Sequence, residues 1–135
     1  MSDERDWNAY NRGVIEEFRA NGGKDGIILL TTIGAKSGLP RVTPLVYTTD
    51  GDRVLIIASK GGSPTHPDWY HNLMAHPEVT VELGPERFLA RAIAAEGAER
   101  RRLYDQMAAQ FPFFADYEKK TPRQIPLIIL ERIDA

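Results

Sequence analysis

Hydrophobic residues recur at helical spacing near the N-terminus, and their period changes further along the chain. An amphipathic helix over about residues 6–20, within an N-terminal segment 1–22, is predicted by a stripe of apolar residues: Trp7, Tyr10, Val14, Ile15 and Phe18. Gly22 and Gly23 supply its C-terminal stop.

Three short runs rich in Ile, Val, Leu and Thr follow, at residues 27–33, 42–48 and 53–59. They are typical of β-strands, and the segments between them are too short to hold crossover helices. The runs are therefore expected to pair in antiparallel fashion, which disfavours a doubly wound nucleotide-binding fold.

The second half of the chain predicts two helices and three strands. Pro67 and Asp68 begin a helix that extends to about Ala75, and apolar residues at i, i+4 spacing indicate a surface helix over residues 96–110. A hairpin is predicted from the segments 79–83 and 87–94. A last strand is predicted over residues 125–133, with its first residues at a sheet edge because Pro126 lacks an N–H donor.

These elements predict a single α+β domain over residues 1–135, with about six mainly antiparallel strands and peripheral helices. A sheet curled into a small barrel is favoured because closure hides strand edges. An open sheet with helices on one face is equally compatible with the composition.

Composition narrows the classes of function. The chain has 135 residues, no cysteine and a formal net charge of −2. A disulfide framework and cysteine chemistry are thereby excluded, and bulk attraction to nucleic acid is disfavoured. No stretch approaches the ~18 apolar residues of a membrane span, and the acidic N-terminus does not resemble a secretory signal, so a cytoplasmic location is expected.

One loop combines flexible glycines with cations. Residues 26–49 contain no Asp or Glu, and the loop at 34–41 contains Lys36 and Arg41. Glycine lets backbone N–H groups converge while Lys and Arg neutralise negative charge, so this loop is a candidate phosphate site. It is not a Walker A loop, and a solvated hairpin with incidental charges is the alternative.

A second loop, at residues 58–64, has a similar make-up. It contains Ser59, Lys60 and the pair Gly61-Gly62, which would let a flat ring lie close to the backbone. The alternative is an ordinary flexible connector. Both loops follow strands that the short connections are expected to make neighbours or near neighbours in the sheet.

Other candidate groups are weaker. Steps of five residues place His66 and His71 on different faces of a helix, so no metal site is expected. A late aromatic cluster consists of Phe111, Phe113, Phe114 and Tyr117. It indicates either core packing or the wall of a substrate pocket.

Several short motifs follow one another along the chain: Thr31-Thr32-Ile33-Gly34-Ala35-Lys36-Ser37-Gly38, Pro40-Arg41, Ala58-Ser59-Lys60-Gly61-Gly62, His66-Pro67, Trp69-Tyr70-His71-Asn72-Leu73 and His76-Pro77. Together, in this order, they resemble the deazaflavin-dependent nitroreductase family of actinobacteria. The resemblance implies a split β-barrel like that of FMN-binding proteins. It also implies coenzyme F420, an 8-hydroxy-5-deazaflavin with a phosphate and an anionic oligoglutamate tail, with FMN as a less favoured cofactor.

The resemblance also implies roles for individual residues. Cofactor binding is implied for Lys36, Ser37, Gly38, Pro40, Arg41, Ala58, Ser59, Lys60, Gly61, Gly62, Pro67 and Trp69. Ser59 and Tyr117 are implied as catalytic groups. The implied substrate pocket consists of Phe111, Phe114 and Tyr117, with phenylalanine at two positions where relatives that activate nitro drugs have tyrosine.

The function expected from the resemblance is hydride transfer from F420H2 to a quinone, an enone or a nitro compound, with quinones preferred over nitroimidazoles. A non-catalytic F420 carrier and an FMN-dependent reductase are the alternatives. The expected partners are a small-molecule acceptor and a second copy of the chain in a homodimer. A lipid quinone as acceptor would place the protein at the membrane periphery.

Overall fold

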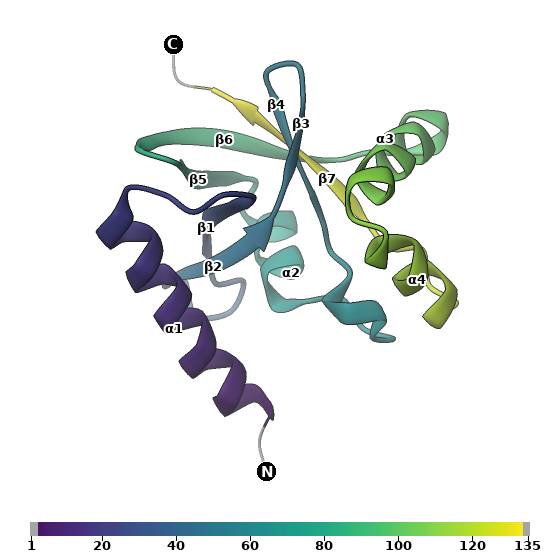
Figure 1. Cartoon of the computed structure of the whole chain (residues 1–135). Helices are drawn as coiled ribbons and strands as arrows, with labels where there is room; N and C mark the ends of the chain where they lie inside the picture. The colour runs from purple at the N-terminus through teal and green to yellow at the C-terminus, as the bar shows by residue number, and fades with distance from the viewer. Residues whose placement is uncertain (1–2, 134–135) are drawn as a thin grey trace.

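The computed structural model describes the backbone of residues 3–133 and the side chains from Ala9 to Ile133. The helices are α1 (Asp3–Asn21), α2 (Asp68–Ala75), α3 (Gly97–Gln110) and α4 (Phe113–Lys120) (Figure 1). The strands are β1 (Ile27–Ile33), β2 (Pro40–Val46), β3 (Thr48–Asp50), β4 (Arg53–Ile57), β5 (Glu78–Leu83), β6 (Glu86–Ala94) and β7 (Leu127–Arg132). A short 3-10 turn, η1 (Lys60–Gly62), follows β4.

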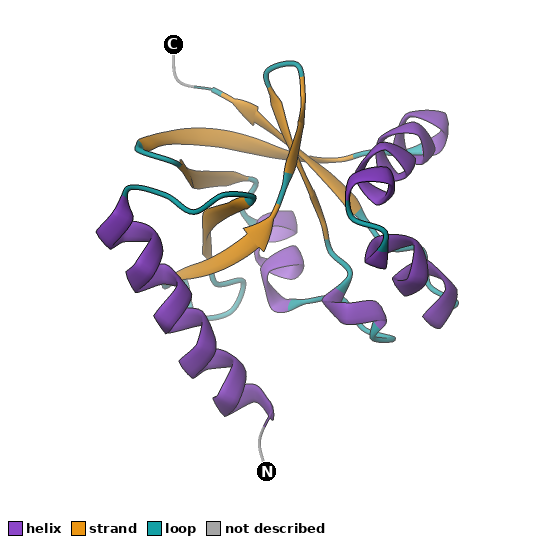
Figure 2. Cartoon of the chain, in the orientation of Figure 1, coloured by secondary structure: helices purple, strands orange, loops and turns teal. Residues whose placement is uncertain are grey.

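The seven strands form one antiparallel sheet in the order β2-β1-β5-β6-β7-β4-β3. The two edge strands, β2 and β3, are consecutive in the chain, and only Tyr47 separates them. The two edges of the sheet must therefore lie close together, so the sheet curls into a split barrel (Figure 2). The predicted α+β split barrel is confirmed.

The sheet has seven strands rather than about six because the predicted strand 42–48 is divided. Its first part lies in β2 and pairs with β1, whereas Thr48 already belongs to β3 and pairs with β4. The division lets one continuous segment of chain supply both edges of the sheet.

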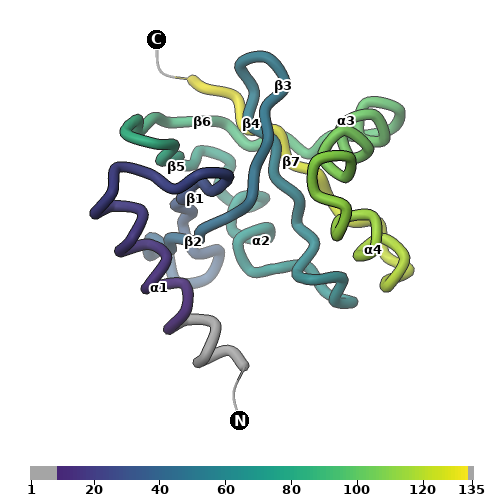
Figure 3. Tube along the Cα trace, in the orientation of Figure 1, coloured from purple at the N-terminus to yellow at the C-terminus, as the bar shows by residue number. Residues whose placement is uncertain are grey.

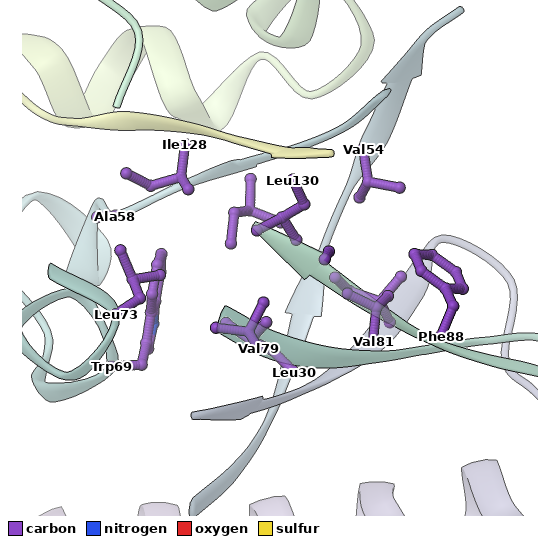
Figure 4. Close-up of a cluster of buried hydrophobic side chains, with 13 residues drawn as sticks. Leu30, Val54, Ala58, Trp69, Leu73, Val79, Val81, Phe88, Ile128 and Leu130 are labelled. Carbon is purple, nitrogen blue, oxygen red and sulfur yellow. The ribbon is translucent and has the colours of Figure 1, made fainter. Parts of the chain in front are cut away.

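Two hydrophobic clusters lie on opposite faces of β4 and β7. Val54 and Ile56 point into the barrel, where they pack with residues of β1, β5, β7 and α2 (Figure 4). Leu55 and Ile57 point outward and pack under α3 and α4. Because both faces are buried, these strands have continuous apolar runs instead of alternating polar and apolar positions.

The last strand is not at an edge of the sheet. β7 lies between β6 and β4 and is hydrogen-bonded to both. The edge position predicted from Pro126 is therefore wrong, because Pro126 precedes the paired residues and needs no donor for the ladder. Its carbonyl instead accepts the N–H of Ala58, at 2.9 Å.

Helix α4 was not expected from the sequence. It begins directly after Pro112 and is joined to α3 by the Tyr104 hydroxyl, which donates to the carbonyl of Phe114 at 2.9 Å. Figure 3 shows the segment after β4 running beside α4, and the two are in contact.

The predicted N-terminal helix is confirmed as α1. Phe18 is its buried residue among those with described side chains, whereas Tyr10 is 63% exposed. The Trp7 side chain lies outside the described residues. Within residues 3–133, no helix is both long enough and apolar enough to cross a membrane.

Candidate functional site

The two loops singled out from the sequence follow strands that are not neighbours. The first loop, residues 34–41, follows β1, and the second loop, residues 58–64, follows β4. Strands β5, β6 and β7 lie between these two strands in the sheet. The expectation of neighbouring strands is therefore wrong. The curl of the sheet brings them to face each other, since side chains of β1 and β4 share the interior cluster. Helix α2 follows the second loop directly and also contacts β1 (Figure 1).

The first loop is closed by its own backbone. The N–H of Gly34 donates to the carbonyl of Leu39 at 2.8 Å, and the N–H of Gly38 donates to the carbonyl of Gly34 at 2.9 Å. The Ser37 hydroxyl oxygen accepts the N–H of Leu39 at 3.1 Å. A Cβ at Gly34 would collide with that oxygen, so the Ser37 hydroxyl would have to move. Ser37 therefore shapes the loop, and its hydroxyl proton is still available to a ligand.

The cations of the first loop are free to meet an anion. Lys36 and Arg41 are exposed, and neither side chain forms an ion pair or hydrogen bond with another residue of the described chain. Pro40, also exposed, begins β2 between them. Two unpaired cations in a segment without acidic residues favour a phosphate or carboxylate ligand.

Asn72 of α2 holds the first loop in place, and the sequence reasoning missed it. Its Oδ1 accepts the N–H of Ala35 at 2.9 Å, and its Nδ2 donates to the Thr32 hydroxyl at 3.1 Å. Asn72 is buried between Trp69 and Leu73 on the inner face of α2. An amide on an otherwise apolar helix face is the signal that could have revealed it.

The second loop presents free backbone donors. Ser59 has right-handed helical dihedral angles, and the next three residues, Lys60, Gly61 and Gly62, have φ values of 48°, 64° and 81°. The N–H groups of Ser59, Lys60 and Gly61 have no acceptor within the described chain. A right-handed residue followed by a left-handed one directs successive N–H groups toward a common point, which suits an anionic or carbonyl oxygen.

Three other predicted cofactor residues lie at the inner side of the second loop. Ala58 and Trp69 are buried in the interior cluster (Figure 4), and Pro67 is buried directly before α2. Trp69 therefore contributes mainly to packing and has only 7% of its surface left for a ligand. The Ser59 hydroxyl has no hydrogen-bond partner among the described residues.

Helix α4 lies against the second loop and carries Phe113, Phe114 and Tyr117 of the late aromatic cluster, whereas Phe111 ends α3. Lys120 donates to the carbonyl of Gly61 at 3.2 Å. Phe114 is 5% exposed and packs into the cluster under α3, so it offers little surface to a substrate. Phe111 and Tyr117 are half-buried, and Phe113, which the predicted pocket omitted, is 39% exposed with its ring 5.6 Å from that of Tyr117.

Arg123 supports the second loop from the segment between α4 and β7. Its guanidinium donates to the carbonyls of Ala58, Ser59 and Ser63 and to the ring of His66. Burial, together with the charge of Arg123, lowers the pKa of His66. Sequence reasoning missed this role, because Arg123 lies about sixty residues from the loop in the chain.

A hollow of the surface lies away from the two loops, between α1 and the β5–β6 hairpin. Its charged side chains include Arg19 and Glu82, which form an ion pair at 2.8 Å. These two charges neutralise each other, so this groove has less to offer an anion than the first loop. The described residues also contain no cluster of metal-ligating side chains.

Comparison with known proteins identifies the family. A family model described as F420H(2)-dependent quinone reductase matches residues 5–132. The chain belongs to this quinone reductase family. The match covers nearly the whole chain, including both loops, α2 and α4, and it confirms the deazaflavin-dependent relationship that the motifs indicated.

Individual relatives agree with the family. A Mycobacterium tuberculosis protein (strain H37Rv) named F420H(2)-dependent quinone reductase is 42% identical over 108 residues, which are 78% of this chain and 72% of that protein. A solved structure described as an F420-H2 dependent reductase (FDR-A) is 40% identical, covers 79% of this chain and 95% of its own, and has a TM-score of 0.74. Another, described as a domain-swapped dimer, is 36% identical, covers 94% and 98%, and has a TM-score of 0.77.

In this member of the quinone reductase family, Asn72→Ala is expected to lower stability by about 1–3 kcal/mol, because the N–H of Ala35 and the Thr32 hydroxyl lose their partner. Urea unfolding measures the change. Met74→Ala, which removes a 52% exposed side chain from the same helix, is the control. Equal stability of the two variants would show that Asn72 does not anchor the loop.

Proposed function

We propose that this chain is an enzyme that transfers a hydride from F420H2 to a quinone or a similar electron-poor acceptor. The observation that carries the proposal is the pairing of two loops within a chain of the F420H(2)-dependent quinone reductase family. One loop offers unpaired cations, the other offers unpaired N–H donors, and α2 connects them.

The residues of the two loops fit coenzyme F420. Lys36 and Arg41 suit its phosphate and carboxylate groups. The backbone at Gly61 is open, since a Cβ there would meet no atom within 4 Å, so a flat ring can approach it. The N–H groups at Ser59 and Lys60 suit the carbonyl oxygens of such a ring. When bound, F420H2 supplies the hydride; the protein supplies binding, orientation and electrostatics.

Reduction of a quinone to a hydroquinone requires one proton as well as one hydride. The Ser59 hydroxyl lies at the start of the left-handed turn and has no partner within the described chain. It can orient the ring or relay a proton to the acceptor oxygen. Tyr117, half-buried on α4 beside Gly62, is the second hydroxyl proposed for this role.

The acceptor is proposed to bind along α4. Phe111, Phe113 and Tyr117 provide apolar walls with one hydroxyl, which suits a planar, weakly polar molecule. Phe114 contributes to this wall only through the neighbours that it supports. Quinones are therefore expected to be better acceptors than nitroimidazoles, which need more polar anchors.

Ser59→Ala is expected to lower kcat at least about tenfold while changing F420 affinity much less, because the hydroxyl acts at the reacting ring and not on the charged tail. Tyr117→Phe is expected to lower kcat for carbonyl acceptors. Oxidation of F420H2 by menadione, followed by absorbance, measures both. Ser63→Ala is the control, since Ser63 lies in the same loop and its hydroxyl bonds Thr65.

The outcomes separate the proposal from its alternatives. Tighter binding of FMN than of F420 would identify an FMN-dependent reductase. Tight F420 binding without turnover of any quinone, enone or nitroaromatic compound would identify a carrier. A change in KM alone for Ser59→Ala would remove that residue from the chemistry.

A homodimer is also proposed. It is supported by α1, where the apolar side chains of Val14 and Ile15 are only half-buried and can pack against a second copy. The relative described as a domain-swapped dimer has a similar chain. Sedimentation equilibrium distinguishes dimer from monomer. The cytoplasmic location, with attachment to the membrane periphery for a lipid quinone, stays a prediction.

A further inference from the structure

We propose that Arg123 is a positioning residue that fixes the direction of the N–H donors in the second loop, and thereby sets the affinity for F420. The inference rests on the proposed function, since it assigns those donors to the cofactor. Arg123 lies between α4 and β7 and is half-buried.

The guanidinium of Arg123 is fully occupied by the loop. Its Nη2 donates to the carbonyls of Ser59 at 2.8 Å and Ala58 at 3.3 Å, and its Nε donates to the carbonyl of Ser63 at 2.9 Å. Its Nη1 donates to His66 Nδ1 at 2.8 Å and to the carbonyl of Ala58 at 3.4 Å. An arginine has five N–H donors, so none is left for a cofactor.

These contacts determine where the loop donors point. In a planar trans peptide the C=O and the following N–H point in opposite directions, and the described chain has no cis peptide bond. Because the carbonyls of Ala58 and Ser59 point toward Arg123, the N–H groups of Ser59 and Lys60 point away from it. Arg123 therefore turns these two donors toward the side where a ligand can reach them.

The loop needs this support because its backbone is strained. Lys60 has a φ of 48°, a left-handed conformation that is unfavourable for any residue with a side chain. Without Arg123, the carbonyls of Ala58 and Ser59 would lose a charged donor and the turn could relax. His66 fits the same arrangement, because its Nδ1 must be unprotonated to accept from Arg123.

A lysine cannot replace this arginine. Its three donors leave from a single nitrogen and cannot reach three carbonyls and a ring nitrogen at once. Arg123→Lys is therefore expected to restore little of what Arg123→Ala loses. Free guanidinium ion has the planar shape of the missing group and is expected to restore more.

The test compares Arg123→Ala, Arg123→Lys and the wild type by two measurements. Hydrogen exchange of the amides in residues 58–66, followed by mass spectrometry without cofactor, reports the loop itself. F420 titration, with and without millimolar guanidinium chloride, reports the consequence for binding. Arg101→Ala is the matched control, because Arg101 joins α3 to α4 through Glu118 and does not touch the loop.

Arg123→Ala is expected to speed exchange in residues 58–66 and weaken F420 binding by about tenfold or more, the loss of a charge-assisted contact. Guanidinium is expected to reverse the binding defect saturably, whereas sodium chloride at equal concentration does not. The residues 34–41, which Asn72 holds, should exchange as in the wild type.

Unchanged exchange in Arg123→Ala would overturn the inference, as would unchanged F420 affinity or an equal defect in Arg101→Ala. Failure of guanidinium to restore affinity would likewise contradict a local role for this side chain. A wild-type protein that does not bind F420 would instead overturn the proposed function, and the exchange rates would still decide whether Arg123 fixes the loop.

Discussion

Replacing Lys36 and Arg41 together by alanine is expected to weaken F420 binding by about a hundredfold, and each single replacement by about tenfold, because each removes a charge-assisted contact to the anionic part of the cofactor. Both side chains are exposed and neither has an ionic partner within the described chain. The fold should therefore be unaffected, and the loss should appear in affinity alone. Titration of each variant with F420 measures it.

Salt and a distant cation provide the controls. Binding to the wild type should weaken as salt is added, and the double variant should show a smaller salt dependence because it has lost the two charges. Lys24→Ala removes an exposed cation that precedes β1, at the end opposite to the first loop. If Lys24→Ala weakens binding as much as Arg41→Ala does, the anion site is not in the first loop.

Alanine substitutions at the two adjacent glycines of the second loop are expected to lower stability by different amounts. In Gly62→Ala, the new Cβ would lie 3.2 Å from the Lys120 side chain and 3.3 Å from the Tyr117 Cα, so α4 must shift. This crowding should cost about 1–3 kcal/mol in addition to the strain of a left-handed backbone. In Gly61→Ala, the Cβ meets no atom within 4 Å, so only the strain remains.

The variant with the smaller loss of stability, Gly61→Ala, should show the clear loss of F420 affinity. Gly61→Ala places a methyl group where the flat ring is proposed to lie, so it should lose at least about tenfold in affinity although its stability falls by only about 1–2 kcal/mol. Gly62→Ala should show the larger loss in urea unfolding. Full F420 affinity in Gly61→Ala would show that the ring lies elsewhere.

The strands could be predicted because their patterns are local. The helix after Pro67 and the hairpin of β5 and β6 also agree with the prediction within a residue or two. The division between β2 and β3 could not be predicted, because the strand-forming residues run without a break through Thr48. Only the pairing shows that the chain leaves β1 and joins β4 at this point. The edge position predicted from Pro126 was wrong because a proline that precedes a strand does not prevent the strand from pairing on both sides.

The candidate site, like the fold, could be predicted only where its signals are local in the sequence. The two loops could be found because glycine, lysine and serine in a short segment are a local signal. Arg123 could not, because it acts on backbone 60 to 65 residues away in the sequence. Asn72 acts on backbone 37 residues away, and its one local signal is an amide on an otherwise apolar helix face. For Phe114, the sequence left core packing and a pocket wall as alternatives, because the choice depends on how α4 packs on α3; the structure places its side chain in the core.

The measurement that tests the proposed activity most directly is turnover of the purified protein with F420H2 and menadione in the absence of FMN. One F420H2 should be oxidised for each menadione reduced, and the rate should rise with enzyme concentration and fall in Ser59→Ala. No oxidation of F420H2 with any quinone, or activity only after FMN is added, would contradict an F420H2-dependent quinone reductase.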